Sequence, residues 1–180
     1  MPDFKKSLAV GKTGESEIAT WFRGKGYNVL PVYEIAENQF KGPAVIAFDG
    51  GEIIAPDMLV FNTNKAWWIE AKHKSAFTWH RITKQWVTGI DLHHYDEYQK
   101  INRLAIWPVW LMFLHKDGIA KDTPKGMKSP TGLYGNSLDY LFLKENHRHR
   151  NYGKTGMVYW SVANLKKIAD YPIVEVNYAN

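Results

Sequence analysis

Cysteine is absent from this 180-residue chain, which excludes disulfide bonds and thiolate zinc sites and favours a reducing compartment. No apolar run approaches the ~20 residues needed to cross a bilayer. Residues 1–6 also lack the apolar core of a signal peptide. From these absences we expect a cytoplasmic protein without a membrane partner.

Two familiar kinds of site are missing as well. Residues 11–14 (Gly-Lys-Thr-Gly) lack the preceding glycine, at the required spacing, of a Walker-type phosphate loop. Seven histidines are present, but neither the adjacent His93 and His94 nor the pair His147 and His149 comes with the third ligand of a zinc site. The sequence therefore argues against a nucleotide hydrolase and against a metal held by histidines.

The overall charge is moderately basic. There are 23 Lys and Arg residues against 18 Asp and Glu residues, which gives a net charge of +5 and a pI near 9.2. This balance suits a nucleic-acid partner but does not establish one. The chain has no internal repeats, and its length predicts one domain over residues 1–180, large enough to bury a core.

The most informative stretch places charged residues within two apolar segments. Residues 53–61 are β-branched and apolar and predict a buried strand that contains Asp57. Residues 62–65 form a turn cluster, and residues 66–72 predict the returning strand of a hairpin. Glu70 and Lys72 then share one face, about 6–7 Å apart. Taken singly, Asp57 could be a turn acid and the other two a solvated ion pair; together they indicate a functional site.

The residue types fit a metal that acts on phosphate. Mg²⁺ takes oxygen ligands, commonly one or two carboxylates with water and phosphate oxygens. Asp57 and Glu70 would supply the carboxylates, and the backbone carbonyl of Ala71 a third oxygen. Bound Mg²⁺ or Mn²⁺ lowers the pKa of a coordinated water and neutralises charge on the phosphate. Lys72 would stabilise that charge, so the arrangement predicts hydrolysis of a phosphodiester.

The dipeptide Pro56-Asp57, followed by Glu70-Ala71-Lys72, resembles the motif of the PD-(D/E)XK nuclease superfamily, which includes restriction endonucleases and archaeal Holliday-junction resolvases. Residues 14–22 resemble the first helix of the resolvase-like members, with a strand expected at residues 27–32. The resemblance implies an α/β (α+β) protein with a restriction-endonuclease-like αβββαβ core, in which helices flank a central mixed sheet. It covers about residues 8–115, which leaves residues 116–180 as a C-terminal elaboration.

The superfamily also places an acidic residue on the helix ahead of these strands. Glu15 shares a helix face with Ile18 and Phe22, whereas Glu17 lies on nearly the opposite face. A carboxylate on the same helix face as core residues is costly to bury, so a functional role is the better explanation for its position. We therefore favour Glu15 over Glu17 as the acidic residue of the site. The alternative is that both acids stabilise the positive N-terminus of a helix capped near Thr13.

Two basic segments are candidates for contact with DNA. Residues 72–86 interleave basic and aromatic side chains, which can follow a phosphate backbone; the alternative is a two-stranded excursion held by Trp79 and Trp86. Residues 144–154 are the densest basic stretch, and arginine pairs bidentately with phosphate; the alternative is a solvated loop. The candidate DNA-binding residues are Lys74, Arg81, Lys84, Arg148, Arg150 and Lys154.

The remaining pattern completes the expected order of elements. A helix should begin at its N-cap Asp91 and end at Pro108, before a central strand over residues 109–114. Residues 116–136 are rich in Lys, Gly, Pro, Thr and Ser and predict a long loop. Beyond it we expect strands at residues 138–143 and 157–162 and an amphipathic helix at residues 163–169.

Together these features predict a Mg²⁺- or Mn²⁺-dependent DNA endonuclease with Glu15, Asp57, Glu70 and Lys72 in its catalytic site. The resolvase-like helix favours a structure-selective enzyme of DNA recombination or repair, and a homodimer if it cuts four-way junctions. A restriction-type or repair nuclease, an exonuclease or an RNA nuclease would present the same residues. The competing class is a non-catalytic DNA-binding module on a nuclease fold, although decay would be expected to remove at least one of these charged residues.

Overall fold

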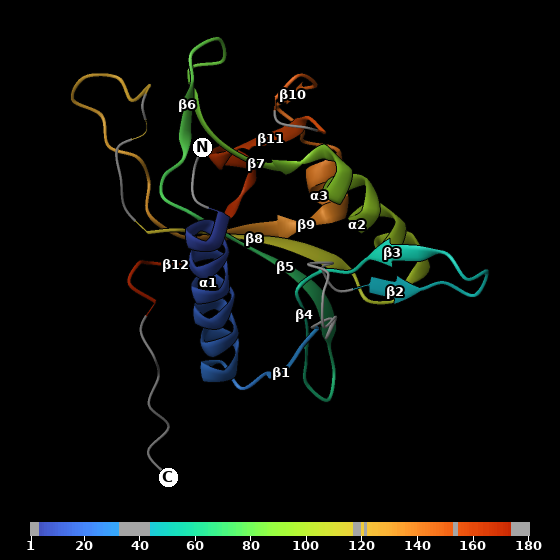
Figure 1. The fold of residues 1–180 in the computed structure, drawn as a ribbon. Coiled ribbons are helices and arrows are strands. Elements are labelled where there is room, and N and C mark those ends of the chain that lie inside the picture. Colours follow the sequence, from blue (N-terminus) through green and yellow to red (C-terminus); the bar gives the residue numbers. More distant parts are fainter. Residues whose placement is uncertain (1–3, 33–43, 117–119, 121, 153–154, 174–180) are drawn as a thin grey trace.

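A six-stranded mixed sheet forms the centre of the molecule in the computed structural model, which describes residues 4–32, 44–116, 120, 122–152 and 155–173. β5 (Ala66–Lys74) and β8 (Val109–His115) are parallel, and the other neighbouring strands of this sheet are antiparallel. The strands lie in the order β1 (Asn28–Pro31), β4 (Met58–Phe61), β5 (Ala66–Lys74), β8 (Val109–His115), β9 (Gly132–Ser137) and β12 (Lys166–Ala169) (Figure 1).

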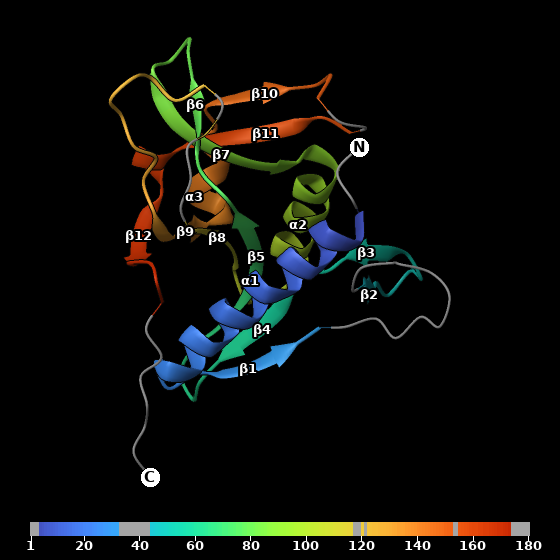
Figure 2. The ribbon, with the colours of Figure 1, turned by 60° about the vertical axis from the view of Figure 1, so that its left-hand side comes forward.

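Helices cover both faces of this sheet (Figure 2). α1 packs across one face, where Ile18 lies in the same apolar cluster as Ile69 of β5. α2 and the short α3 cover the other face, over a cluster that includes Tyr98 and Leu111. Because side chains alternate along a strand, consecutive residues of β5 point into different layers. The helices are α1 (Phe4–Gly24), α2 (Leu92–Leu104) and α3 (Leu138–Phe142).

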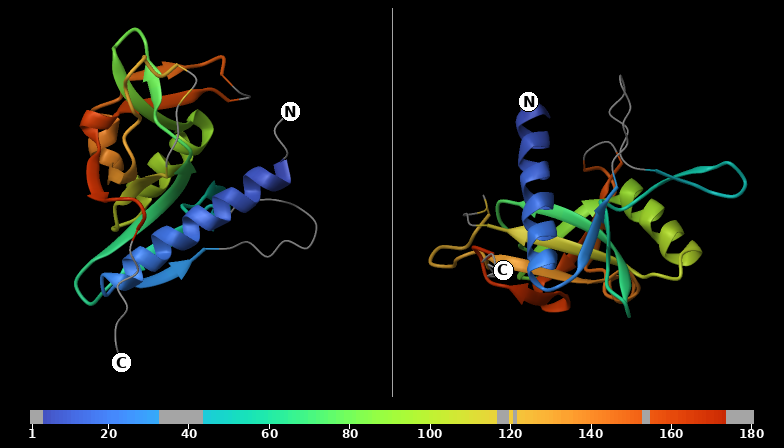
Figure 3. Two further views of the ribbon diagram at one scale, coloured as in Figure 1. Left: turned by 90° about the vertical axis from the view of Figure 1, so that its left-hand side faces the viewer. Right: turned by 90° about the horizontal axis from the view of Figure 1, so that it is seen from below.

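A second, four-stranded sheet stands beyond the end of β5 (Figure 3). Two of its strands form the two-stranded excursion that was the alternative interpretation of residues 72–86, with the rings of Trp79 and Trp86 5.1 Å apart. A separate two-stranded hairpin precedes β4. The four-stranded sheet has the order β10 (His147–His149), β11 (Met157–Ser161), β7 (Gln85–Asp91) and β6 (Thr78–His80), and the hairpin consists of β2 (Ala44–Ile46) and β3 (Glu52–Ile54).

The expected core is present once these additions are set aside. Its elements follow the order α1, β1, β4, β5, α2 and β8, which is αβββαβ, with helices packed on a central mixed sheet. α2 begins directly after Asp91, as expected, although the side chain of Asp91 makes no capping hydrogen bond. No helix among the described residues is both long and apolar enough to cross a membrane.

Two expectations for the C-terminal third are wrong. Residues 138–143, expected as a strand, mostly form α3, because Ser137 caps the helix and its Oγ accepts a hydrogen bond from the Tyr140 N–H. The strand beside β8 comes earlier, and all of it except Ser137 lies within the residues expected to be a loop. Residues 163–169, expected as a helix, form a 3₁₀ turn (Val162–Asn164) and the edge strand β12, since pairing with β9 overrides the helical pattern.

Two boundaries near the charged motif also differ from expectation. Residues 53–61 form β3 and β4 with a break between them, because Pro56 has no N–H to donate to a ladder. α1 begins at Phe4 rather than near Thr13, so Glu15 and Glu17 lie well inside the helix. The alternative that they stabilise the first turn of the helix is therefore wrong.

Candidate active site

Asp57 directly precedes β4, at the point where β4 and β5 stop pairing. The ladder between β4 and β5 ends at the pair Met58 and Ile69. Beyond that end, the backbone N–H of Ala71 donates a hydrogen bond of 2.8 Å to Asp57 Oδ2. The break at Pro56 and this hydrogen bond together turn the carboxylate of Asp57 toward β5.

Glu70 and Lys72 point to the α2 side of β5, since Ile69 and Ala71, which alternate with them along the strand, belong to the cluster under α1. Glu70 is only 1 % exposed, and Lys72 Nζ forms an ion pair with its Oε1. Neither oxygen of Glu70 accepts a hydrogen bond of ordinary geometry from the described residues. A buried carboxylate with so few hydrogen bonds is costly unless cations stand beside it.

The charges of these groups influence one another strongly. Burial and the neighbouring charge of Glu70 raise the pKa of Asp57 to about 7, against the opposite effects of Lys72 and the Ala71 N–H. Burial alone would lower the pKa of Lys72, but Glu70, Asp57 and Glu15 more than offset it, so the pKa of Lys72 is raised. Lys72 is therefore a cation at neutral pH, whereas Asp57 is divided between its charged and neutral forms.

The two candidate acids of α1 have different partners. Glu15 contributes to the raised pKa of Lys72, so its charge acts on the group on β5. Glu17 forms an ion pair with Lys116 at the end of β8. Glu15 therefore acts electrostatically on Lys72, whereas Glu17 has a partner elsewhere, and the role of Glu15 in the site stays a prediction.

The close approach of α1 to β5 depends on Gly14. A Cβ at this position would overlap with the Cβ of His73 in β5. Glycine inside a helix costs about 1 kcal/mol relative to alanine, so its presence here needs a reason. Close packing beside Glu15 supplies one.

The donor set fits a hard divalent cation. Asp57 and Glu70 offer carboxylate oxygens, and their mutual repulsion contributes to the raised pKa of Asp57, which a cation between them would relieve. Across the described ranges, no three or more His, Asp or Glu side chains form a group that could hold a metal ion. Water, substrate oxygens and the carbonyl of Ala71 would have to complete the shell, as Mg²⁺ commonly accepts.

Two residues of α2 adjoin the site although the sequence patterns did not assign them to it. Tyr98 is buried, and its pKa is raised by that burial and by the charges of Glu70 and Asp57. His94 lies one turn earlier, with its ring 6.0 Å from that of Tyr98. Burial and Lys72 lower the pKa of His94, while Asp57 acts in the opposite direction. Their i, i+4 spacing places both on one face of the helix, but no pattern within α2 assigns that face to the site.

No protein-family model and no curated protein matches this chain. Among solved structures, the chain is similar to Hjc, a Holliday junction resolvase from Archaeoglobus fulgidus. The identity is 8 % over 86 % of this chain and 90 % of that chain, with a TM-score of 0.47. It is also similar to a nuclease from a fusselovirus, with 14 % identity over 93 % of this chain and 89 % of that chain and a TM-score of 0.41. Both likenesses are of fold.

Three of the basic residues expected at a DNA surface are free of ion pairs among the described residues. Lys74 ends β5 next to the site, where burial and Lys72 lower its pKa and Asp91 raises it. Lys84 is exposed in the turn between β6 and β7, and Arg150 is exposed after β10. Their side chains can turn to a phosphate without first breaking an ion pair.

The other expected DNA contacts are engaged or undescribed. Arg81 pairs with Asp122 at 2.5 Å. Arg148 donates two hydrogen bonds, of 2.7 and 2.8 Å, to the carboxylate of Glu145. Each would have to leave its partner to reach a phosphate. Lys154 lies outside the described residues.

Proposed function

We propose that this protein is a metal-dependent DNA nuclease with Asp57, Glu70, Lys72 and Glu15 as its catalytic group. The observation that carries the proposal is a coupled pair of carboxylates beside a protonated lysine, at a fork between two strands. Desolvating two carboxylates together is costly, and shifted pKa values of this kind gather at functional sites. The αβββαβ core supports the proposal because it carries this group on two adjacent strands and the facing helix.

Each residue has a distinct proposed role. Asp57 and Glu70 bind Mg²⁺ or Mn²⁺, with the carbonyl of Ala71 as a further oxygen ligand. When bound, the metal neutralises charge on the phosphate and lowers the pKa of its water. Lys72 stays protonated at neutral pH, which suits a fixed cation facing the phosphoryl oxygens better than a general base. Glu15 assists from the helix side, through the metal or its water.

The proposed substrate is DNA, on the basis of the net charge of +5 and the basic side chains near the site. Lys74, Lys84 and Arg150 are the first candidates for phosphate contact. Within this class we propose a structure-selective endonuclease of recombination or repair, because the first helix and the charged motif resemble those of resolvases. A restriction-type nuclease or an exonuclease would use the same catalytic group.

The test is cleavage of linear duplex, single-stranded, flap and four-way-junction DNA in Mg²⁺ or Mn²⁺. Replacing Lys72 by Ala should lower the cleavage rate by ~100-fold or more, because a fixed charge beside the developing phosphoryl charge contributes several kcal/mol. The matched control is Lys125→Ala, at an exposed position of the segment before β9, which should cleave like the wild type.

Each other outcome of this test has a defined meaning. Equal cleavage by wild type and Lys72→Ala would contradict the proposed site. DNA binding without cleavage by either protein would favour the non-catalytic binding module. Cleavage of RNA strands alone, included in the same panel, would replace the proposed substrate and keep the catalytic group.

A further inference from the structure

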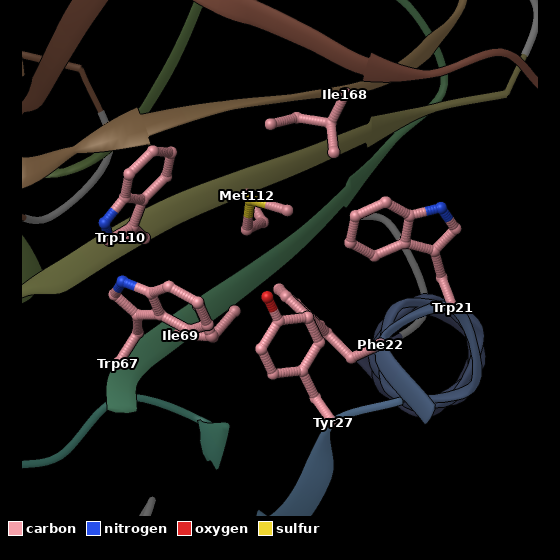
Figure 4. A pocket seen from close by; sticks show the side chains of 8 residues that line it. All are labelled: Trp21, Phe22, Tyr27, Trp67, Ile69, Trp110, Met112 and Ile168. Atoms are coloured by element: carbon pink, nitrogen blue, oxygen red, sulfur yellow. The ribbon is translucent and has the colours of Figure 1, made fainter. Parts of the chain in front are cut away.

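An apolar pocket of about 180 Å³ lies on the α1 side of the six-stranded sheet (Figure 4). Trp21 stands on one side of it, and Trp67 and Trp110 stand on the other. Ile69 and Met112 are almost fully buried and form the floor. The pocket has room for one large apolar side chain.

The three tryptophans remain only partly buried around this space. Large aromatic rings contribute most when they are fully buried, so leaving three of them partly exposed at one place is unfavourable. A ligand that fills the pocket would bury these rings further. The lining therefore has the composition of a binding site for an apolar group.

Consecutive residues of β5 separate this pocket from the carboxylates. Ile69, at the pocket floor, belongs to the cluster under α1, whereas Glu70 points to the α2 side. A molecule seated in the pocket thus leaves the face with Glu70 and Lys72 open. Binding at the pocket and chemistry at the carboxylates can occur together.

Two lysines stand at the rim of the pocket, each over one of its tryptophans. Lys25 Nζ lies 5.9 Å from the ring centre of Trp21, and Lys166 Nζ lies 5.6 Å from that of Trp110. Both lysines are exposed, and neither pairs with a carboxylate among the described residues. The rim therefore offers two cations to an incoming anion.

We propose that this pocket captures a large apolar side chain from an acidic segment of another protein. The apolar side chain fills the space between the tryptophans, and the neighbouring carboxylates of the segment meet Lys25 and Lys166. An apolar anchor in a pocket with complementary charges at the rim is a general mode of protein recognition. Because the opposite face stays free, the partner would recruit this protein without blocking its catalytic group.

A nucleobase is a poorer occupant of the same pocket. Its hydrogen-bonding edge would lose water, and the side chains of Ile69 and Met112 at the floor carry no nitrogen or oxygen to replace it. An apolar side chain has no such edge. The composition of the floor therefore favours the peptide over the nucleic acid.

The test measures fluorescence anisotropy of a labelled peptide of five aspartates followed by one phenylalanine, added to the full chain. Two further peptides test the apolar anchor and the charge separately. One has five aspartates followed by alanine, and the other has five lysines followed by phenylalanine. We expect saturable binding of the acidic phenylalanine peptide, at least ~10-fold weaker binding of the alanine peptide, and none of the basic one.

The variants test the rim and the space separately. Changing Lys25 and Lys166 together to Glu should weaken binding at least ~10-fold, whereas changing the exposed Lys125 and Lys128 together to Glu should not. Ile168→Trp, on edge strand β12, narrows the pocket and should also reduce binding. The two lysine double variants carry the same net charge and should cleave DNA at equal rates, and Ile168→Trp should cleave as the wild type does, which separates this inference from the proposed nuclease activity.

Four results would overturn the proposal. They are the absence of saturable binding, equal affinity for the alanine peptide, equal loss in both lysine double variants, and binding that Ile168→Trp leaves unchanged. A single-stranded oligothymidylate is the remaining arm of the experiment. If it displaces the peptide and loses affinity only in the Lys25 and Lys166 variant, the pocket is a nucleic-acid site and the peptide proposal is wrong.

Discussion

At the scale of single residues, Asp57 is held where its own charge is disfavoured. Its pKa of about 7 in the folded protein lies above the value of ~3.9 for an unfolded chain. The folded state therefore binds this proton more tightly, and stability falls as the pH rises from about 4 to about 7. Above pH 7 the loss is complete unless a cation binds beside the carboxylate.

Replacing Asp57 by Asn should therefore stabilise the metal-free protein at high pH. We expect Tm at pH 8 to rise by up to roughly 8–16 °C, since the raised pKa of Asp57 corresponds to about 4 kcal/mol and 1 kcal/mol moves the Tm of a domain of this size by about 2–4 °C. The same variant should lose the stabilisation by Mn²⁺ and the cleavage that we expect of the wild type.

Thermal unfolding at pH 5 and pH 8, with and without Mn²⁺, checks this prediction. Asp96→Asn, an exposed aspartate of α2, is the control and should leave both the pH dependence and the metal effect unchanged. An Asp57→Asn variant that Mn²⁺ stabilises as much as the wild type would remove Asp57 from the metal site.

His115 shifts stability in the opposite direction. Burial, chiefly, lowers its pKa to about 3 from the ordinary 6.5, and its ring stacks on that of Phe77 at 3.7 Å. The unfolded chain therefore binds this proton more readily, and stability is lost as the pH falls from about 6.5 toward 3. In the same pH range, protonation of Asp57 raises the stability as the pH falls. Each effect must therefore be measured as a difference in stability between the wild type and a variant.

Substituting Phe for His115 should remove the part of the pH dependence that this residue causes. Between pH 6 and pH 4, the free energy of unfolding of the wild type should fall relative to that of His115→Phe by about 1 kcal/mol per pH unit. Urea unfolding at several pH values measures this difference. A constant difference across the range would mean that His115 does not titrate as proposed.

The candidate site was predictable only where it is local in sequence. Glu70 and Lys72 share a face because strands alternate, and Asp57 is carried by the preceding segment. Tyr98 and His94 meet this group only because α2 packs across the sheet, which no pattern within α2 specifies. The contribution of α2 to the site depends on long-range packing, so it could not be predicted from the sequence.

At the scale of elements, the reliable expectations were those in which pattern and propensity agree. The apolar run of residues 109–114 is a central strand of the sheet. β9 was missed because Gly132, Gly135 and Asn136 are poor strand formers, yet the strand is almost wholly buried against β8. A Cβ at Gly135 would lie 2.7 Å from the carbonyl oxygen of Leu111. The close contact between β9 and β8 therefore requires glycine, although glycine is a poor strand former.

The packing of α1 on β5 at Gly14 gives a prediction about a whole element. Gly14→Ala improves helix propensity by about 1 kcal/mol, but its Cβ would overlap with His73 and push the helix away. We expect lower stability, by about 1–3 kcal/mol, because overpacking forces the backbone to shift. Cleavage should fall as well, since Glu15 moves with the helix.

The matched control is Ser16→Ala, an exposed position of the same helix that should be neutral or slightly stabilising. Combining Gly14→Ala with His73→Gly removes the Cβ of His73 that the new alanine would overlap. The double variant should therefore cleave as fast as the single variant His73→Gly. Stability by urea unfolding and the single-turnover cleavage rate are the two measurements. A Gly14→Ala protein that matches Ser16→Ala in both would contradict the close approach.

At the scale of the whole molecule, an exposed apolar surface is the best candidate for contact between two copies. Ile106 is 89 % and Leu30 is 55 % exposed, and Trp107 is 39 % exposed. Leu30 and Trp107 also line a hollow of about 480 Å³ with Leu59 and Phe61. A projecting side chain next to a hollow is self-complementary, as a two-fold interface requires. We propose this surface for the homodimer expected of an enzyme that cuts four-way junctions.

Ile106→Asp should therefore convert a dimer into a monomer in sedimentation velocity runs, because a buried unpaired carboxylate opposes association. Ile82→Asp makes the same change at an 87 % exposed isoleucine in the β6–β7 turn and should leave the dimer intact. A wild-type protein that is monomeric at all accessible concentrations, or equal behaviour of the two variants, would rule this surface out as the dimer interface.

The pairing of β5 also has a consequence for the order of folding. β4 is joined to β5 by the short turn of residues 62–65, whereas β8 is separated from it by residues 75–108. Shorter loops close faster, so we expect the β4–β5 hairpin to form first. Glu70 and Lys72 lie past the end of that hairpin, on the part of β5 that pairs with β8.

Pulse-labelled hydrogen exchange during refolding tests this order. The Val60 amide should be protected before the Lys72 amide, and the reverse order would contradict it. If the order holds, newly made chains assemble their carboxylate group only after the β4–β5 hairpin has formed. If the proposed nuclease activity is correct, partly folded molecules would then be unable to nick the nucleic acid around them.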